Sequence, residues 1–198
     1  MKIGILALQG AFIEHSHILK KIGIEVIEVR LPADLSSLNG LIIPGGESTT
    51  ILKLMNIFNL YEPLKKAIIE DFPVWGTCAG MICLAKNVTN SQISKLTPLG
   101  VMDIQVKRNA FGRQVDSFES DLNVDVLGKK LFHAVFIRAP LIEKVGEGVE
   151  VLAKLPDGTI VAARQGNLLV TSFHPELTND HRFHEYFVKM AEQIKNKK

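Results

Sequence analysis

The chain has 198 residues, of which 46% are hydrophobic and 22% are charged. This balance excludes a disordered chain and a coiled coil, and the length predicts a single domain spanning residues 1–198. The 23 basic and 21 acidic residues are scattered along the chain and leave a net charge of +2. Because nucleic-acid binding needs a concentrated basic stripe, we expect no nucleic-acid partner.

The chain contains only two cysteines, Cys78 and Cys83. They cannot form a disulfide framework and lack the spacing of a zinc site, so we expect no metal and a reducing, cytoplasmic location. The apolar run at residues 3–13 imitates a signal peptide, but Gln9 and Gly10 interrupt it and no cleavage site follows. No stretch reaches the about 18 apolar residues of a membrane span, so we expect no membrane partner.

In the first half of the chain, short apolar runs alternate with stretches of helical periodicity. We expect strands at residues 3–8, 24–29, 41–43 and 73–75. We expect helices at residues 12–22, from Ser48 or Thr49 as the cap onwards, at 63–70, and after Gly80. This alternation predicts an α/β fold of three layers, in which helices cover both faces of a mostly parallel central sheet.

The second half has a different pattern, with short runs separated by turn residues. We expect strands at residues 101–106, 115–118, 135–138, 149–155, 160–164 and 168–173. Turn residues at 156–158 and 165–167 join the last three of these closely, which indicates antiparallel strands added to the parallel sheet. An amphipathic stretch at residues 180–194 predicts a final helix.

The segment Gly76-Thr77-Cys78-Ala79-Gly80 joins an expected strand to an expected helix. This is the setting of a nucleophile elbow, in which small residues permit a sharp turn that exposes the nucleophile. A cysteine there also benefits from the helix N-terminus, which favours the thiolate. The alternative for Cys78 is a buried cysteine beside a tight turn, and that is the role we expect for Cys83.

A thiolate nucleophile needs a base and a group that orients the base. His174 and Glu176 directly follow an expected strand, with Pro175 stiffening the link between them. Glu176 can hold one imidazole nitrogen while the other faces the sulfur. Packing at a strand end is the alternative for His174. For the other five histidines, surface or packing roles are sufficient; they are His15, His17, His133, His181 and His184.

The stretch Pro44-Gly45-Gly46-Glu47-Ser48 follows a strand and opens a helix. Successive glycine N–H groups there can form a nest for an anion, although the lysine of a phosphate-binding loop is missing. The nest suits an oxyanion hole, built from one N–H of Gly46 and one of Ala79. A plain glycine turn is the alternative.

Together these segments resemble the class I glutamine amidotransferases, and most closely the glutaminase subunits of pyridoxal 5′-phosphate synthase. The matching segments are residues 6–10, 14–15, 44–49, 76–80, 108–114, 136–140 and 173–177. The elbow and the His-Pro-Glu are shared across the superfamily. The Leu-Gln-Gly at 8–10, the segment at 108–113 and the Ile-Arg-Ala-Pro at 137–140 indicate this subunit. The resemblance implies a flavodoxin-like sheet.

The resemblance also implies a reaction and a partner. Cys78 would attack the side-chain amide of L-glutamine, His174 would protonate the leaving ammonia, and Glu176 would hold the imidazole. The ammonia would pass to the lyase subunit that builds pyridoxal 5′-phosphate, so this molecule is a product of the complex and this chain would need no cofactor. Gln9 and Gly10 would belong to a loop that senses the partner. The implied glutamine-binding residues are Gly46, Glu47, Ser48, Arg108, Ile137 and Arg138.

Within that pocket, a carboxylate such as Glu47 suits the α-ammonium group of glutamine, and an arginine suits its α-carboxylate. For Arg108 and Arg138 the alternative is a surface pair. Three other functions remain open from the residues. They are a glutaminase that serves another synthase, a cysteine-elbow protein of the peptidase or chaperone type, and a non-catalytic α/β binding module.

Overall fold

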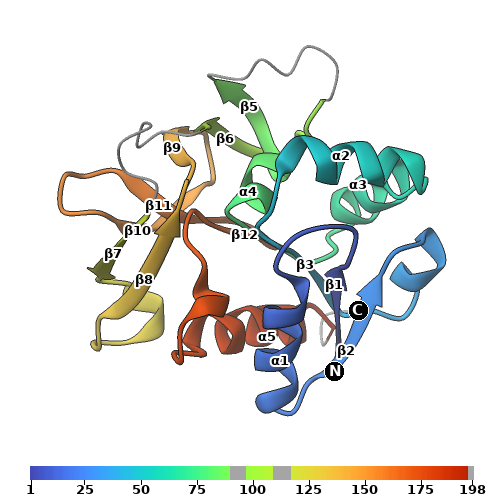
Figure 1. The fold of residues 1–198 in the computed structure, drawn as a ribbon, viewed down its shortest axis with the longest axis horizontal. Helices are drawn as coiled ribbons and strands as arrows, with labels where there is room; N and C mark the ends of the chain where they lie inside the picture. The colour runs from blue at the N-terminus through green and yellow to red at the C-terminus, as the bar shows by residue number, and fades with distance from the viewer. Residues whose placement is uncertain (90–96, 109–116, 196–198) are drawn as a thin grey trace.

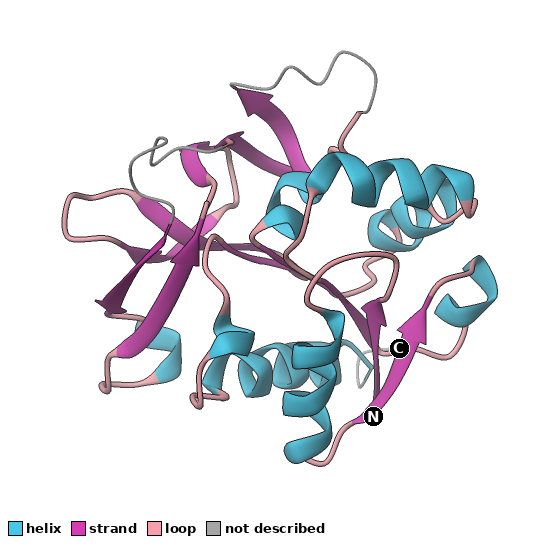
Figure 2. Cartoon of the chain, in the orientation of Figure 1, coloured by secondary structure: helices cyan, strands magenta, loops and turns pink. Residues whose placement is uncertain are grey.

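The structure, a computed structural model, describes residues 1–89, 97–108 and 117–195. A central sheet runs through the molecule with helices on both sides (Figures 1 and 2). Its strands are β1 (Lys2–Leu6), β2 (Glu25–Val29), β3 (Gly40–Ile43), β4 (Val74–Thr77), β5 (Ala85–Thr89), β6 (Met102–Lys107), β9 (Leu141–Val145), β10 (Glu150–Lys154), β11 (Ile160–Gln165) and β12 (Leu168–Thr171). A separate hairpin consists of β7 (Ser117–Leu122) and β8 (Phe132–Ile137).

The sheet has the order β2-β1-β3-β4-β12-β11-β9-β6-β5, and β10 pairs with β11. The strands from β2 to β12 are mutually parallel, which is the flavodoxin-like arrangement. From β11 onwards antiparallel pairs enter, at β11–β12, β9–β11 and β6–β9. The predicted fold class is therefore confirmed, including the antiparallel strands contributed by the second half.

The helices and the hairpin divide between the two faces of the sheet (Figure 1). One face is covered by α2 (Ser48–Ile57), α3 (Tyr61–Ile69) and α4 (Ala79–Leu84). The other is covered by α1 (Phe12–Lys21), α5 (Arg182–Lys195) and the β7–β8 hairpin. Each face buries its own apolar cluster, as expected when both faces of a parallel sheet are covered. Among the described residues, no helix is long and apolar enough to cross a membrane.

Two strands were not predicted. β5 and β9 bury few of their residues, so neither carries a continuous apolar run or a clear alternation. β5 lies at the edge of the sheet and pairs with β6 alone. Such segments become strands because they pair with neighbouring strands that are distant in the sequence, and their own pattern of apolar and polar residues does not show this pairing. Residues 115 and 116 of one predicted strand lie outside the described residues, and its remainder belongs to β7.

The parallel strands bring distant loops to one edge of the sheet. The segments that follow β1, β3, β4 and β12 carry Gln9, Gly46, Cys78 and His174 respectively. In flavodoxin-like sheets, ligands bind at the carboxyl ends of the strands, next to the point where strand order reverses. That point here lies between β1 and β3.

Candidate active site

Cys78 occupies a strained turn between β4 and α4. Its backbone has φ +48° and ψ −104°, a region that non-glycine residues rarely adopt. Two flanking glycines make the turn possible. A Cβ on Gly76 would lie 2.5 Å from the carbonyl carbon of Gly80, and one on Gly80 would lie 2.0 Å from Ile43 O. Only glycine fits at these two positions, and the structure therefore has the elbow that the spacing predicts.

His174 connects this turn to a buried carboxylate. Its Nδ1 lies 2.6 Å from Glu176 Oε1, and its other nitrogen is left for the hydrogen bond with Cys78. Burial opposes a charge on His174, but the hydrogen bonds with Cys78 and Glu176 outweigh it and raise the pKa of His174 to about 10. An imidazolium beside a sulfur is the setting in which a cysteine becomes nucleophilic.

The backbone of Gly45 forms the wall behind the imidazole. A Cβ on Gly45 would lie 2.5 Å from His174 Cε1 and 3.3 Å from Cys78 Cβ. The loop is also joined to the segment after β1. Ala11 N donates to Gly45 O at 3.0 Å, and Glu47 N donates to Gln9 Oε1 at 2.8 Å. A movement of residues 9–11 would therefore be transmitted to residues 45–47.

The predicted oxyanion donors are Gly46 N, in the segment that follows β3, and Ala79 N, at the first residue of α4; both residues line the cavity with Cys78. Within the described part of the chain, neither N–H donates to a protein acceptor. Both groups are thus available to a ligand in the cavity, although their role as an oxyanion hole stays a prediction.

Glu47, rather than the predicted Ser48 or Thr49, caps α2. Its carboxylate accepts from Thr50 N at 2.7 Å and Thr49 N at 3.3 Å, and from both threonine hydroxyls. The prediction of the cap was wrong because the longer side chain of Glu47, one position before the helix, reaches forward to the N–H groups of Thr49 and Thr50. Ser48 is already in the helix, and its buried Oγ has no partner among the described residues.

Glu47 also pairs with Arg108, whose Nη2 lies 3.1 Å from Glu47 Oε1. Burial alone would raise the pKa of Glu47, but the hydrogen bonds from Thr49 and Thr50 lower it to about 2. The carboxylate is therefore ionised at neutral pH and is already occupied by protein donors. A substrate ammonium group at Glu47 would join these partners or displace Arg108.

The cap predicts a pH-dependent stability. Glu47→Gln should lower the free energy of unfolding by about 0.5–1 kcal/mol at neutral pH, because Glu47 is half-exposed and solvent screens its charge. The folded pKa is depressed, so the carboxylate stabilises the fold above its ordinary pKa of 4.5 and loses this effect as pH falls toward about 2. Denaturant unfolding across that range should show the two proteins converging.

The matched control for this prediction is Glu62→Gln, in the first turn of α3, where the carboxylate is exposed. It should change the free energy of unfolding less than Glu47→Gln at neutral pH. A Glu47→Gln difference that is the same at every pH would contradict the assignment of the charged carboxylate as the cap.

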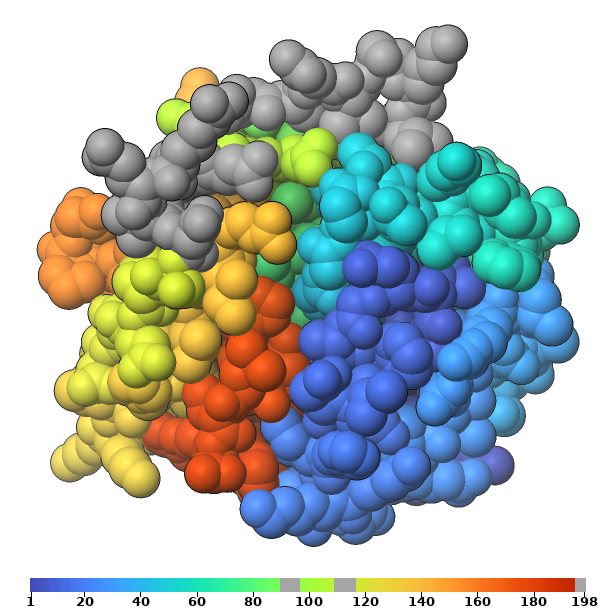
Figure 3. All heavy atoms as spheres, viewed as in Figure 1, coloured from blue at the N-terminus to red at the C-terminus, as the bar shows by residue number. Residues whose placement is uncertain are grey.

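All the predicted site residues line one cavity of about 520 Å³. They are Gln9, Gly10, Gly46, Glu47, Ser48, Cys78, Ala79, Arg108, Ile137, Arg138, His174 and Glu176. Arg138 has φ +42°, and Ile137 O lies 3.9 Å from Cys78 Sγ. The residues after β12 lie at the surface between the N-terminal segment and the β7–β8 hairpin (Figure 3). Residues 109–114 of the matching segment 108–114 lie outside the described residues.

Two histidines that sequence reasoning assigned to packing or surface roles lie behind the triad. His15 and His184 are fully buried and hydrogen-bonded to each other, and His15 also approaches Glu176. Both are packed in the interior, one of the two expected roles, but in addition their ring nitrogens face polar groups. The presence of His15 in the matching segment 14–15 was the one available signal.

We compared the chain with protein-family models and with known proteins to find its family. The family model described as the SNO glutamine amidotransferase family matches residues 5–193. The chain belongs to this family. It is 63% identical over 195 residues to the pyridoxal 5′-phosphate synthase subunit PdxT of Dehalococcoides mccartyi, covering 98% of this chain and all of that protein (100%). The corresponding protein of Herpetosiphon aurantiacus is 61% identical over 188 residues, covering 95% of this chain and 99% of that protein.

Solved structures agree with the family assignment. A crystal structure described as a glutamine amidotransferase matches with a TM-score of 0.89 at 50% identity, covering 96% of this chain and 98% of that chain. The chain is therefore a glutamine amidotransferase. The alternatives of a cysteine-elbow peptidase or chaperone and of a non-catalytic binding module are set aside.

Proposed function

We propose that this chain is the glutaminase subunit of a pyridoxal 5′-phosphate synthase. It hydrolyses L-glutamine to L-glutamate and ammonia, and the ammonia passes to the lyase subunit that uses it. The relatives that carry the name of this synthase subunit support the choice of synthase over another ammonia acceptor. The observation that carries the chemistry is the strained Cys78 turn, which faces the His174–Glu176 pair inside the cavity.

In the first half of the reaction, Cys78 Sγ attacks the side-chain amide carbon of glutamine. The carbonyl oxygen becomes an oxyanion, for which the N–H groups of Gly46 and Ala79 are the proposed donors. Removing one such donor typically costs about 2.7–4 kcal/mol of transition-state stabilisation. The C–N bond then breaks as His174 gives its proton to the leaving nitrogen, and a thioester and ammonia form.

In the second half, water attacks the thioester carbon. His174, now neutral, takes a proton from that water, and the C–S bond breaks to release glutamate and the Cys78 thiolate. Glu176 holds the imidazole in one orientation in both halves because its Oε1 stays on Nδ1. These steps use only groups of this chain and water, so we assign no cofactor to this chain. Pyridoxal 5′-phosphate is a product of the complex.

The two charged groups on the α-carbon of glutamine need partners of opposite charge in the pocket. Glu47 suits the α-ammonium group, and Arg108 or Arg138 suits the α-carboxylate. Because Glu47 and Arg108 are paired at 3.1 Å, a zwitterion can insert between them and satisfy both charges. The buried hydroxyl of Ser48, which has no partner among the described residues, is a further donor in the lining of the cavity.

Activity should depend on the partner. Gln9 holds Glu47 N–H, and the neighbouring Ala11 holds Gly45 O, so the loop after β1 controls the proposed oxyanion loop. We propose that docking of the lyase subunit near Gln9 and Gly10 selects the competent conformation of residues 45–47.

The test is ammonia release from L-glutamine by the full chain, alone and mixed with the lyase subunit of a pyridoxal 5′-phosphate synthase. If the competent loop conformation is populated about a tenth of the time, the partner should raise the rate on the order of tenfold. L-Asparagine, which is one methylene shorter, serves as the control substrate and should be turned over poorly. Absence of ammonia release both from the chain alone and from its mixture with the lyase subunit would refute the function. Equal rates of ammonia release in the two assays would refute only the dependence on the partner.

A further inference from the structure

Behind the proposed triad, away from the cavity, lies a buried group of polar side chains. His15, on α1, is fully buried and does not line the cavity. Its Nε2 lies 3.4 Å from Glu176 Oε2 and 3.3 Å from Thr77 Oγ1. On the other side of the ring, His15 Nδ1 lies 2.9 Å from Nε2 of His184. The triad thus continues through Glu176 into a pair of histidines.

Glu176 Oε2 is the oxygen that needs a donor. Oε1 is occupied by His174, whereas Oε2 is buried and makes no hydrogen bond of good geometry within the described residues. Leaving a buried carboxylate oxygen unsatisfied is costly. The contact with His15 Nε2 is longer than an ideal hydrogen bond, but active-site contacts of this kind often shorten when substrate binds.

The positions of the nitrogens decide the tautomers. If His15 Nε2 carried no hydrogen, its lone pair would face the Glu176 carboxylate oxygen, and the Thr77 hydroxyl would be its one neighbour able to donate among the described residues; we therefore assign the hydrogen to this nitrogen. A neutral His15 then has a bare Nδ1, which must accept from His184 Nε2–H. His184 Nδ1 is consequently bare, which agrees with its having no partner among the described residues. A lone pair without a partner is better tolerated in a protein interior than an N–H without one.

The surroundings favour neutral rings. Burial lowers the pKa of His15 and of His184, and both rings make T-shaped contacts with Trp75. Charged groups act on the pair from several elements. Glu176 and Glu14 favour a charge on His15 and His174 opposes it, while His181 and His15 oppose a charge on His184.

We propose that His15 is a positioning residue of the triad, which donates Nε2–H to Glu176 Oε2, and that His184 fixes the tautomer that makes this possible. With both carboxylate oxygens held, Glu176 cannot rotate away from His174 Nδ1, and the imidazole stays aimed at Cys78. This inference rests on the proposed function, because it assumes that Cys78, His174 and Glu176 act as a triad.

The first test replaces His15 by phenylalanine in the full chain and measures steady-state glutaminase activity with the lyase subunit present. Loss of the donor should lower kcat on the order of 10–100-fold, the range found for outer partners of metal-bound histidines. KM should stay within about twofold because His15 does not line the cavity. His15→Gln places an amide N–H near the position of Nε2 and should recover most of the loss.

The matched control is His17→Phe, the same substitution at an exposed position of α1, which should leave both constants unchanged. A His15→Phe enzyme with wild-type kcat would overturn the proposal. A His15→Gln enzyme no better than the phenylalanine variant would also overturn it, since a residue needed only for packing gives that result.

A second measurement uses the unmodified protein and does not depend on any variant folding. Nitrogen NMR of isotope-labelled histidines in the full chain at neutral pH should show His15 and His184 as neutral Nε2–H tautomers. An imidazolium or an Nδ1–H tautomer at His15 would overturn the proposal. If Cys78→Ala is inactive while His15→Phe is normal, this inference alone fails; if Cys78→Ala is fully active, the triad itself fails.

Discussion

Cys78→Ala should abolish ammonia release from glutamine, by at least about ten-thousandfold in the complex with the lyase subunit. Without Cys78 Sγ, no side chain of the site can form the covalent bond to the amide carbon, so the thioester cannot arise. The only other cysteine, Cys83, is fully buried and cannot substitute for it. The alanine variant should fold normally, because the strained backbone at position 78 is imposed by Gly76, Gly80 and the strands beside them.

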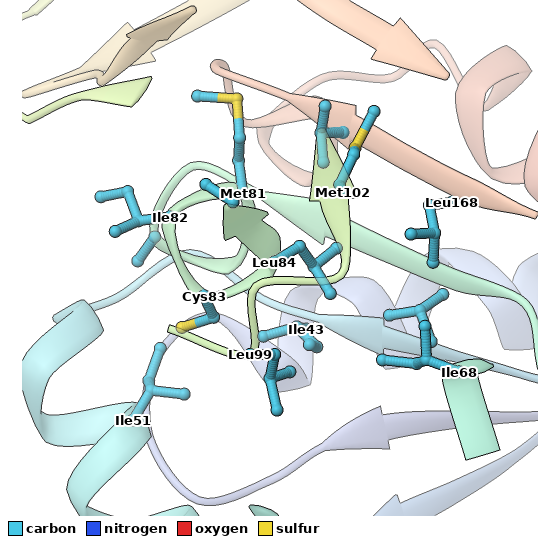
Figure 4. Close-up of a cluster of buried hydrophobic side chains, with 14 of the residues drawn as sticks. Ile43, Ile51, Ile68, Met81, Ile82, Cys83, Leu84, Leu99, Met102 and Leu168 are labelled. Carbon is cyan, nitrogen blue, oxygen red and sulfur yellow. The ribbon is translucent and has the colours of Figure 1, made fainter. Parts of the chain in front are cut away.

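Cys83→Ala is the matched control and should keep its activity. Burial raises the pKa of the Cys83 thiol to about 12, and its side chain points into the apolar cluster near Ile51 and Leu99 (Figure 4). A glutamine analogue with an electrophilic side chain should therefore modify Cys78 and spare Cys83, which peptide mass spectrometry can show. Full activity of Cys78→Ala, or labelling confined to Cys83, would refute the whole site.

Glu176→Gln should lower kcat by up to about ten-thousandfold, the effect of the equivalent change in a serine protease triad. The amide is neutral and cannot stabilise the imidazolium of His174, whose pKa should fall from its raised value. The side-chain amide of the introduced glutamine can also turn its N–H₂ toward His174 Nδ1, which would force the wrong tautomer on the imidazole ring. Steady-state kinetics in the complex would measure the loss, and thermal unfolding would check the fold.

Glu185→Gln, an exposed carboxylate on α5, is the control for this substitution and should have normal kinetics. A Glu176→Gln enzyme within about tenfold of the wild-type kcat would mean that the carboxylate only fills space behind His174. Because Glu176 is buried beside two histidines, that outcome would also remove the basis of the His15 proposal.

Local features were the most predictable from sequence. The elbow at Cys78 requires glycines two residues away on each side, and the His174–Glu176 pair lies within a three-residue segment. Constraints between near neighbours in the chain are recorded directly in residue type and spacing. The parallel half of the sheet was predictable for a similar reason, since doubly covered strands are continuously apolar.

Predictions became less accurate where a neighbour distant in sequence decides the outcome. β5 and β9 have little apolar pattern and are strands because β6 pairs with both. The cap of α2 was predicted at Ser48 or Thr49 and is Glu47, although this contact is local. A glutamate at the N-cap of a helix is unusual. Glu47 has a second role here, because its carboxylate also forms an ion pair with Arg108, the residue directly after β6.

By itself, the sequence determined the fold class, the family, and the residues expected to attack, to shuttle the proton and to orient the base. Only the tertiary structure decided how that base is supported. His15 and His184 are separated by 169 positions, and the residues around them in the sequence do not show that they meet, because a histidine acquires a chemical role from the atoms its nitrogens face. The packing of α1 and α5 on one face of the sheet brings His15 to Glu176 and His184 to His15, and these contacts exist only once the chain has folded.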